Sequence, residues 1–280
     1  MHRPELTTED RVHGGKGASI LTLADLFRHG GSRLIPDQPC SPYRYMEFLI
    51  EKAVQGKFAP ANILEIGPGV DGAIKYLDPE TPKRVLVLDF NRDVIETIGR
   101  RYPKVEARLM DVTETTDLGD LKGQWDYVIC NSVVEHVIDD QALVDRMFAL
   151  LRAGGVVVCS TVLHQRMYNT WDYAVGHYRR YGVAEFETLF KQFSEVQLIK
   201  TAMAQEIARP LFFGRMLHLV RNTIEQNNQL CGHEQEEWGR SPYAGIWFAL
   251  KYLMPVFLVG EWAKRKLFGG IGIIIARKSS

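Results

Sequence analysis

Short apolar runs alternate with amphipathic segments through most of the chain beyond residue 60. Seven runs predict strands, at residues 63–66, 85–88, 104–109, 127–130, 155–159, 195–201 and 270–276. Four intervening segments carry apolar residues at helical spacing, at residues 71–77, 92–102, 139–151 and 183–193. This alternation predicts an α/β fold with a Rossmann-like, seven-stranded, mostly parallel sheet and helices on both faces.

A glycine-rich loop follows the first predicted strand. Gly67, Gly69 and Gly72 have the spacing G-x-G-x-x-G, directly after a strand and before a helix, which is the context of a nucleotide-binding loop. Glycine lets the backbone turn sharply and approach a ligand closely. Asp89 ends the second strand, where a carboxylate can accept hydrogen bonds from both ribose hydroxyls. These residues fit NAD and S-adenosylmethionine equally well.

Further residues separate the two cofactors. Glu65 stands two residues before the first glycine, and Pro68 lacks the N–H that would help to bind a pyrophosphate. Asp111 and Val112 follow the third strand, where a carboxylate and an N–H can meet the edge of adenine. The run 131–137, NSVVEHV, follows the fourth strand. Taken together, residues 60–200 resemble the class I S-adenosylmethionine-dependent methyltransferases.

The resemblance implies a role for each matching residue. Gly67 and Gly69 would pass beneath the methionine and ribose part of the cofactor, with Glu65 and Pro68 in the same loop motif. Tyr43, near the start of the helix that precedes the first strand, is a candidate partner of the methionine carboxylate. The other positions expected to bind the cofactor are Asp89 at the ribose, Phe90, Asp111 and Val112 at adenine, and Asn131 and Ser132 at methionine.

The segment 133–137 with the later run 176–182, GHYRRYG, resembles the broad ubiquinone and menaquinone methyltransferase group. Quinone O-methyltransferases of this group hold a metal with two glutamates and a histidine. Glu135 and His136 match that pattern, but Ser132 stands where the first glutamate would be. Two ligands make a poor site for a divalent ion, so no metal is expected.

Candidate residues for the acceptor lie beyond the fourth and fifth strands. Methylation of a weak acid benefits from a base with a near-neutral pKa, which favours histidine, and the candidates are His177, His136 and His164. Trp171 and Tyr178 belong to an aromatic segment that would form a wall of the acceptor pocket, and Arg179 would hold an anionic group. A purely structural role remains open for each of these residues.

The pattern divides the chain into three parts. Residues 1–56 are expected to form an arm and a helix covering the cofactor site, and 57–203 with 269–280 the methyltransferase core. Residues 204–268 are too long for a structureless loop and hold two apolar stretches, which predicts a helical insertion. The insertion would cap the acceptor pocket, form a homodimer interface or contact a membrane surface. Neither stretch reaches the ~20 apolar residues of a spanning helix.

Composition narrows the choice of partners and compartment. The chain has 34 basic and 34 acidic residues, so no overall field favours nucleic acid. None of its four cysteines forms a Cys-x-x-Cys pair, and the first residues lack an apolar signal region. A cytoplasmic protein, or one peripheral to a membrane, is expected.

These observations predict methyl transfer from S-adenosylmethionine to a small, hydrophobic or amphipathic acceptor, with O- or C-methylation favoured. Two alternatives remain open at this point. One is an NAD-dependent oxidoreductase on the same fold, and the other is a non-catalytic scaffold protein that binds the cofactor.

Overall fold

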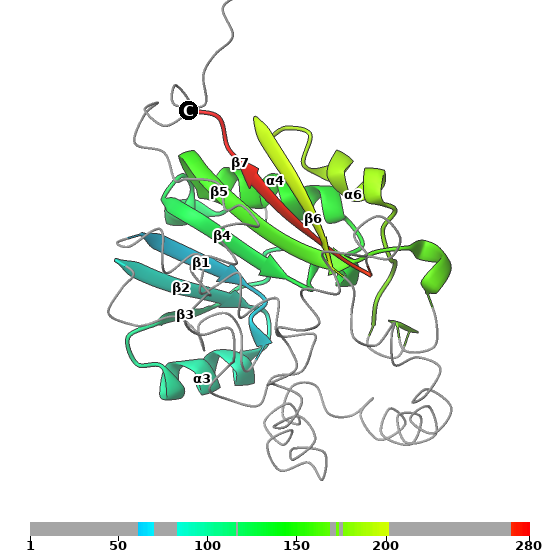
Figure 1. Ribbon diagram of the computed structural model, residues 1–280. Coiled ribbons are helices and arrows are strands. Elements are labelled where there is room, and N and C mark those ends of the chain that lie inside the picture. The colour runs from blue at the N-terminus through cyan, green and yellow to red at the C-terminus, as the bar shows by residue number, and fades with distance from the viewer. Residues whose placement is uncertain (1–60, 70–82, 116, 169–171, 174–175, 202–269) are drawn as a thin grey trace, which may run out of the picture.

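The computed structural model describes residues 61–69, 83–115, 117–168, 172–173, 176–201 and 270–280. They form one seven-stranded sheet in the order β3-β2-β1-β4-β5-β7-β6 (Figure 1). The strands are β1 Asn62–Ile66, β2 Arg84–Asp89, β3 Glu106–Leu109, β4 Trp125–Asn131, β5 Leu151–Val162, β6 Glu195–Thr201 and β7 Ile271–Arg277. The predicted Rossmann-like sheet is confirmed.

Strands β1 to β5 pair in parallel, whereas β7 runs antiparallel to both β5 and β6. β1 lies between β2 and β4, so the chain leaves β1 toward one side of the sheet and later returns to its other side. Parallel α/β sheets bind their ligands at the carboxyl ends of the strands beside such a switch point. The fold therefore directs attention to the ends of β1, β2 and β4.

Three α-helices are described, α3 Arg92–Arg101, α4 Asp140–Leu150 and α6 Val183–Leu189. Asn91 caps α3 by accepting from the backbone N–H of Asp93, and Asp139 caps α4 by accepting from that of Ala142. Helix α6 ends at residue 189 rather than 193, because the backbone turns at Phe190. The predicted helices at 41–56, 71–77 and 204–268 lie outside the described residues.

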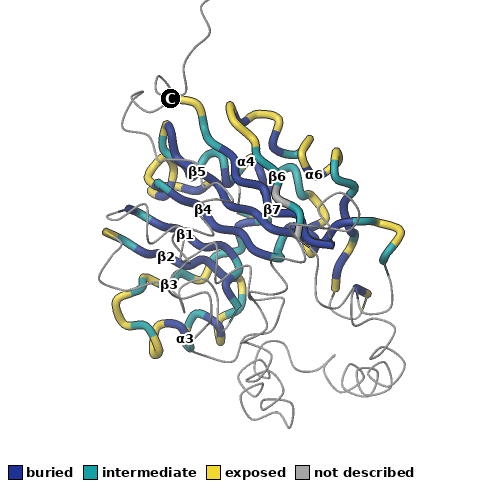
Figure 2. Tube along the Cα trace, viewed as in Figure 1, coloured by how far each residue is buried: buried dark blue, intermediate teal, exposed yellow. Residues whose placement is uncertain are grey.

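The core joins α4 and α6 to the sheet. Leu143 and Met147 of α4 and Phe186 of α6 are fully buried in one apolar cluster with Leu64 and Leu88 of the strands. Helix α3 instead lies beside β2 and β3 and buries Val94 and Ile98. Figure 2 shows the central strands buried along their length. This packing holds the carboxyl ends of β1 and β4 in fixed positions.

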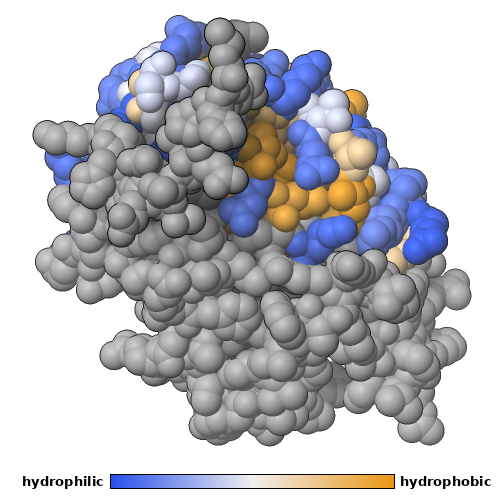
Figure 3. Space-filling view, turned by 45° about the horizontal axis from the view of Figure 1, so that its top comes forward, coloured by the Kyte–Doolittle hydropathy of each residue, from blue (hydrophilic) through white to orange (hydrophobic). Residues whose placement is uncertain are grey.

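On the surface, hydrophilic side chains border a patch of hydrophobic ones (Figure 3). Among the residues that the structure describes, no helix combines the length and the apolar character needed to cross a bilayer.

Candidate active site

The glycine loop leaves the end of β1 in a conformation that favours glycine. Gly67 and Gly69 have φ angles of 64° and 60°, in the left-handed region. The N–H of Gly67 donates to the carbonyl of Leu88 at 2.9 Å, which ties the loop to the end of β2. A Cβ on Gly67 would lie 2.6 Å from Cγ2 of Val133. The loop therefore lies directly against the segment that follows β4.

Asp89 ends β2 beside this loop and is 6% exposed. Burial raises the pKa of its carboxyl group, while the backbone N–H groups of Asn91, Gly69 and Phe90 act in the opposite direction by stabilising the charged form. The N–H of Asn91 donates to Oδ1 at 2.8 Å. The carboxylate is thus held in place at the edge where a ribose is expected. Phe90 next to it is 75% exposed.

Asp111 and Val112 follow β3, at the same edge. Oδ1 of Asp111 accepts from the backbone N–H and the hydroxyl of Thr113, at 2.8 and 2.6 Å, and Val112 is buried. Asp111 is close enough to Asp89 for their charges to repel. The proposed adenine and ribose residues therefore lie near each other, although the contacts with a cofactor remain predictions.

Asn131 and Ser132 terminate β4. The hydroxyl of Ser160 donates to Oδ1 of Asn131 at 3.2 Å, and Nδ2 of Asn131 is buried without a partner among the described residues. Ser132 has a φ of 53°, and its N–H donates to the carbonyl of Ser160. A buried donor without a partner is costly unless a ligand or water accepts from it. Asn131 therefore has a donor available for the predicted methionine side.

Glu65 and Pro68, which complete the loop motif, are both buried. Glu65 lies in β1 between Val87 and Ile129 of the neighbouring strands and is 2% exposed. Tyr43 lies outside the described residues, and so does Trp171.

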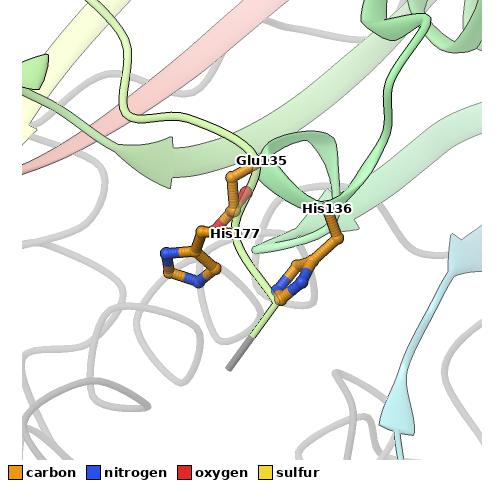
Figure 4. A group of neighbouring side chains, drawn as sticks. All are labelled: Glu135, His136 and His177. Atoms are coloured by element: carbon orange, nitrogen blue, oxygen red, sulfur yellow. The ribbon is translucent and has the colours of Figure 1, made fainter. Parts of the chain in front are cut away.

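A cluster of three polar side chains lies just beyond the residues expected to bind the cofactor. Glu135 and His136 belong to η4, Val134–His136, and His177 comes from the later segment 176–181. One ligand atom from each side chain lies within 4.8 Å of those of the other two. The two imidazole rings lie edge to face, with centroids 4.7 Å apart. Figure 4 shows the three side chains gathered at one place.

Glu135 is fully buried in this cluster. The hydroxyl of Thr161 donates to its Oε2 at 2.9 Å, while Oε1 has no hydrogen-bond partner among the described residues. Burial raises the pKa of Glu135 to about 7, because a carboxylate loses the solvation of water there. Burial and the neighbouring His177 lower the pKa of His136 to about 4.

His177 is held by a buried charged pair. Its Nδ1 lies 2.8 Å from Oδ1 of Asp172, to which Nε of Arg180 also donates at 2.7 Å. All three residues are less than a tenth exposed. A carboxylate at Nδ1 favours the tautomer that leaves Nε2 without a proton. The backbone N–H of Tyr178 donates to the carbonyl of Glu135, which fixes this segment beside η4.

The other candidates for the acceptor are placed differently. Arg179 donates to Oδ2 of Asp140 at 2.7 Å and to the carbonyl of Ile138, so its guanidinium holds the start of α4. Tyr178 is 57% exposed. His164 follows β5 with a φ of 67° and donates its backbone N–H to Tyr181. It is not a member of the three-residue cluster.

Sequence reasoning missed two residues that support the cluster. Asp172 lies in a segment read as aromatic, and Thr161 lies within β5. The sequence offers only the spacing of five residues between Asp172 and His177 as a hint, and that spacing has no meaning without the fold.

The chain is similar in sequence to known methyltransferases. A family model described as "Methyltransferase domain" matches residues 41–194. A protein of Mycolicibacterium smegmatis named "Probable S-adenosylmethionine-dependent methyltransferase" is 30% identical over 132 residues, which are 47% of this chain and 50% of that protein. A protein of Mycobacterium tuberculosis with the same description is 27% identical over 166 residues, covering 57% and 56%. The chain thus spans about half the length of these curated relatives.

Solved structures show the same fold at low sequence identity. Phosphoethanolamine N-methyltransferase 2 of Haemonchus contortus, in complex with S-adenosyl-L-methionine, has a TM-score of 0.54 and 17% identity over 92% of this chain and 58% of that one. The CurJ carbon methyltransferase has a TM-score of 0.53 and 11% identity over 87% and 56%. The match to 41–194 covers more than half of the chain. The chain therefore belongs to the methyltransferase domain family, as a class I S-adenosylmethionine-dependent member.

Proposed function

We propose that this protein transfers the methyl group of S-adenosylmethionine to a hydroxyl or an acidic carbon of a small hydrophobic or amphipathic acceptor. The acceptor's reacting atom would lie beside Glu135, His136 and His177. The observation that carries the proposal is the contact between the glycine loop and the segment after β4, because Gly67 touches Val133 two residues before Glu135.

The order of the strands supports this placement. In the sheet order β3-β2-β1-β4, the predicted adenine residue Asp111 comes first, followed by Asp89, the glycine loop and Asn131. A cofactor laid along these residues would have its methionine end, and therefore the reactive methyl group, near the end of β4. The cluster begins four residues after Asn131.

The reaction asks mainly for positioning. An oxygen or carbon of the acceptor forms the new bond to the methyl carbon, and the C–S bond breaks with its electron pair remaining on sulfur. S-adenosylhomocysteine results, and the acceptor loses one proton. Holding the acceptor in line with the C–S bond can lower the barrier by ~7–11 kcal/mol. The cluster offers polar atoms at the position where the proton is lost.

The proposal assigns roles to the segments outside the described residues as well. Residues 1–56 would cover the cofactor, and 204–268 would cap the acceptor, because their apolar stretches need a partner surface. Residues 204–268 could instead form a homodimer interface or contact a membrane surface. The cytoplasmic location stays a prediction.

Calorimetric titration of the full chain with S-adenosylmethionine, S-adenosylhomocysteine and NAD tests the cofactor. We expect both sulfur compounds to bind and NAD to give no signal, and binding of NAD alone would indicate an oxidoreductase. Incubation with methyl-labelled cofactor and fractionated cell extract then tests the reaction. Label should appear in a small, extractable product. Cofactor binding without any labelled product would favour the scaffold alternative.

A further inference from the structure

In each of the three cluster residues, one polar side-chain atom contacts a partner outside the cluster. Thr161 donates to Oε2 of Glu135, and Asp172 lies at Nδ1 of His177. Nδ1 of His136 lies 3.2 Å from the carbonyl of Gly176. Histidines that bind metals almost always donate their other ring N–H to a carboxylate or carbonyl in this way, which orients the ring and fixes its tautomer.

The atoms left without these partners are Oε1 of Glu135 and Nε2 of each histidine. One possible ligand atom from each of the three side chains lies within 4.8 Å of those of the other two. Oε1 is buried and has no partner among the described residues. An unpartnered carboxylate oxygen in a buried site is costly, and a bound cation would remove that cost.

We propose that Glu135, His136 and His177 bind a divalent metal ion, with zinc as the expected ion. Two imidazoles and one carboxylate are a ligand set of catalytic zinc sites, in which the fourth position stays open for water or substrate. The guanidinium of Arg180 pairs with Asp172, the carboxylate that holds His177. Zn–N distances of about 2.0–2.1 Å place ligand atoms about 3.3 Å apart, so the cluster contracts slightly on binding.

This ligand set differs from the quinone O-methyltransferase pattern. Ser132 occupies the place of the first glutamate there and is not part of the cluster. His177, 41 positions beyond His136, supplies the third ligand instead. No metal was expected from the sequence because only the ligands in the segment 131–137 were considered. The fold brings His177 to them from the segment 176–181.

The role of the metal rests on the proposed function, although its binding does not. A hydroxyl of the acceptor would occupy the open position, where the cation lowers the pKa of the hydroxyl group. Its proton passes to water, the oxygen attacks the methyl carbon, and the C–S electron pair stays on sulfur. No side-chain base is then required.

The site can be tested on the full chain after treatment with a chelator. After the chelator is removed, each protein is titrated with zinc by calorimetry, and its zinc content after reloading is measured by elemental analysis. Both measurements should show one more equivalent of zinc in the wild type than in His177→Gln and Glu135→Gln. His164→Gln is the matched control, since it removes an imidazole outside the cluster. Zinc bound elsewhere on the chain is the same in every variant and therefore cancels in the comparison. Asp172→Asn should keep the site but weaken zinc binding by about 10–100-fold.

Geometry gives a second measurement. Cobalt(II) added in place of zinc should produce the visible absorption of a low-coordinate site in the wild type and the His164→Gln control, and not in His177→Gln. Circular dichroism and S-adenosylmethionine affinity report whether each variant folds. If His177→Gln is misfolded, zinc binding by Glu135→Gln and Asp172→Asn is compared with that of the wild type instead.

Equal zinc content, equal affinity and equal cobalt spectra in wild type and all cluster variants would overturn the proposal. The two hypotheses fail separately. Methyl transfer in a protein whose zinc binding does not depend on the cluster refutes the metal site and leaves the function intact. A zinc equivalent that depends on His177, in a protein that never transfers methyl groups, leaves the site intact and refutes the function.

Discussion

Replacing Gly67 by alanine tests the close approach on which the site depends. The substitution introduces a Cβ at a φ of 64° and places it 2.6 Å from Cγ2 of Val133. Two costs follow, one from the left-handed backbone and one from the clash. The first affects any alanine at this φ, whereas the second exists only if the loop and the segment after β4 really touch.

The two costs have known orders of magnitude. A left-handed residue other than glycine costs roughly 1–2 kcal/mol. Forcing a methyl group into a packed contact costs about 1–3 kcal/mol. Gly67→Ala should therefore lower the free energy of unfolding by about 2–5 kcal/mol. It should also weaken S-adenosylmethionine binding, because the neighbouring segment must move.

A matched control separates the costs. Gly123 has a φ of 69° and no atom within 4 Å of an added Cβ, so Gly123→Ala bears only the backbone term. Val133→Ala removes the methyl group that clashes. The double variant Gly67→Ala/Val133→Ala should thus recover about 1–3 kcal/mol relative to the sum of the single effects.

Urea unfolding followed by circular dichroism gives the free energy of unfolding of the three single variants and the double variant. Calorimetry gives their affinity for S-adenosylmethionine. The reasoning is refuted if Gly67→Ala loses no more stability than Gly123→Ala, or if the Gly67 and Val133 effects simply add. Either result would mean that the glycine loop and the segment 131–137 are farther apart than the structure has them.

Further predictions address the cofactor, the segment beside it and the support of the cluster. Asp89→Asn should weaken S-adenosylmethionine binding by about 1.5–3 kcal/mol in calorimetry, the value of a hydrogen bond to a charged group, and unchanged affinity would exclude the ribose role. Tyr181→Phe removes a buried hydroxyl that lies 2.8 Å from Oδ2 of Asp140 and 3.1 Å from the carbonyl oxygen of Val134; urea unfolding should show a loss of about 1–3 kcal/mol, and no loss would mean that water replaces the bond. Arg180→Met removes the guanidinium that donates to the buried carboxylate of Asp172 at 2.7 Å; the cost should be about 3–5 kcal/mol by the same assay, and an equally stable variant would show that this ion pair does not stabilise the fold.

The central strands could be predicted from sequence because their burial is nearly complete. β1 reads NILEI and β2 reads RVLVLD, and in each all residues but the first are buried. Continuous apolar runs of this kind fit strands covered on both faces. The prediction of β5 was shorter than the strand itself, 155–159 against Leu151–Val162, because two glycines within it suggested a turn. Pairing with β4 starts at Leu151, and the register shifts before it resumes at Val156.

The cofactor edge could also be anticipated, because its residues follow directly from the order of strands. Any residue that ends a parallel strand comes to the same edge of the sheet, so Asp89, Asp111 and Asn131 could be grouped without knowing a single contact. Their bonds could not be foreseen. Asp111 uses Oδ1 for Thr113, and Asn131 uses its own Oδ1 for Ser160.

The grouping of Glu135, His136 and His177 lay beyond sequence reasoning for a physical reason. His177 reaches Glu135 because a backbone hydrogen bond joins Tyr178 to η4, and nothing in the residue types encodes that bond. Arg179, which was expected to hold an anionic group of the acceptor, pairs with Asp140 in the structure. Asp172 contacts both His177 and Arg180, and it belongs to no motif that the sequence could show. The position of a residue at a strand end follows from the order of the strands in the sheet. The position of a loop residue depends on its contacts, which only the folded structure shows.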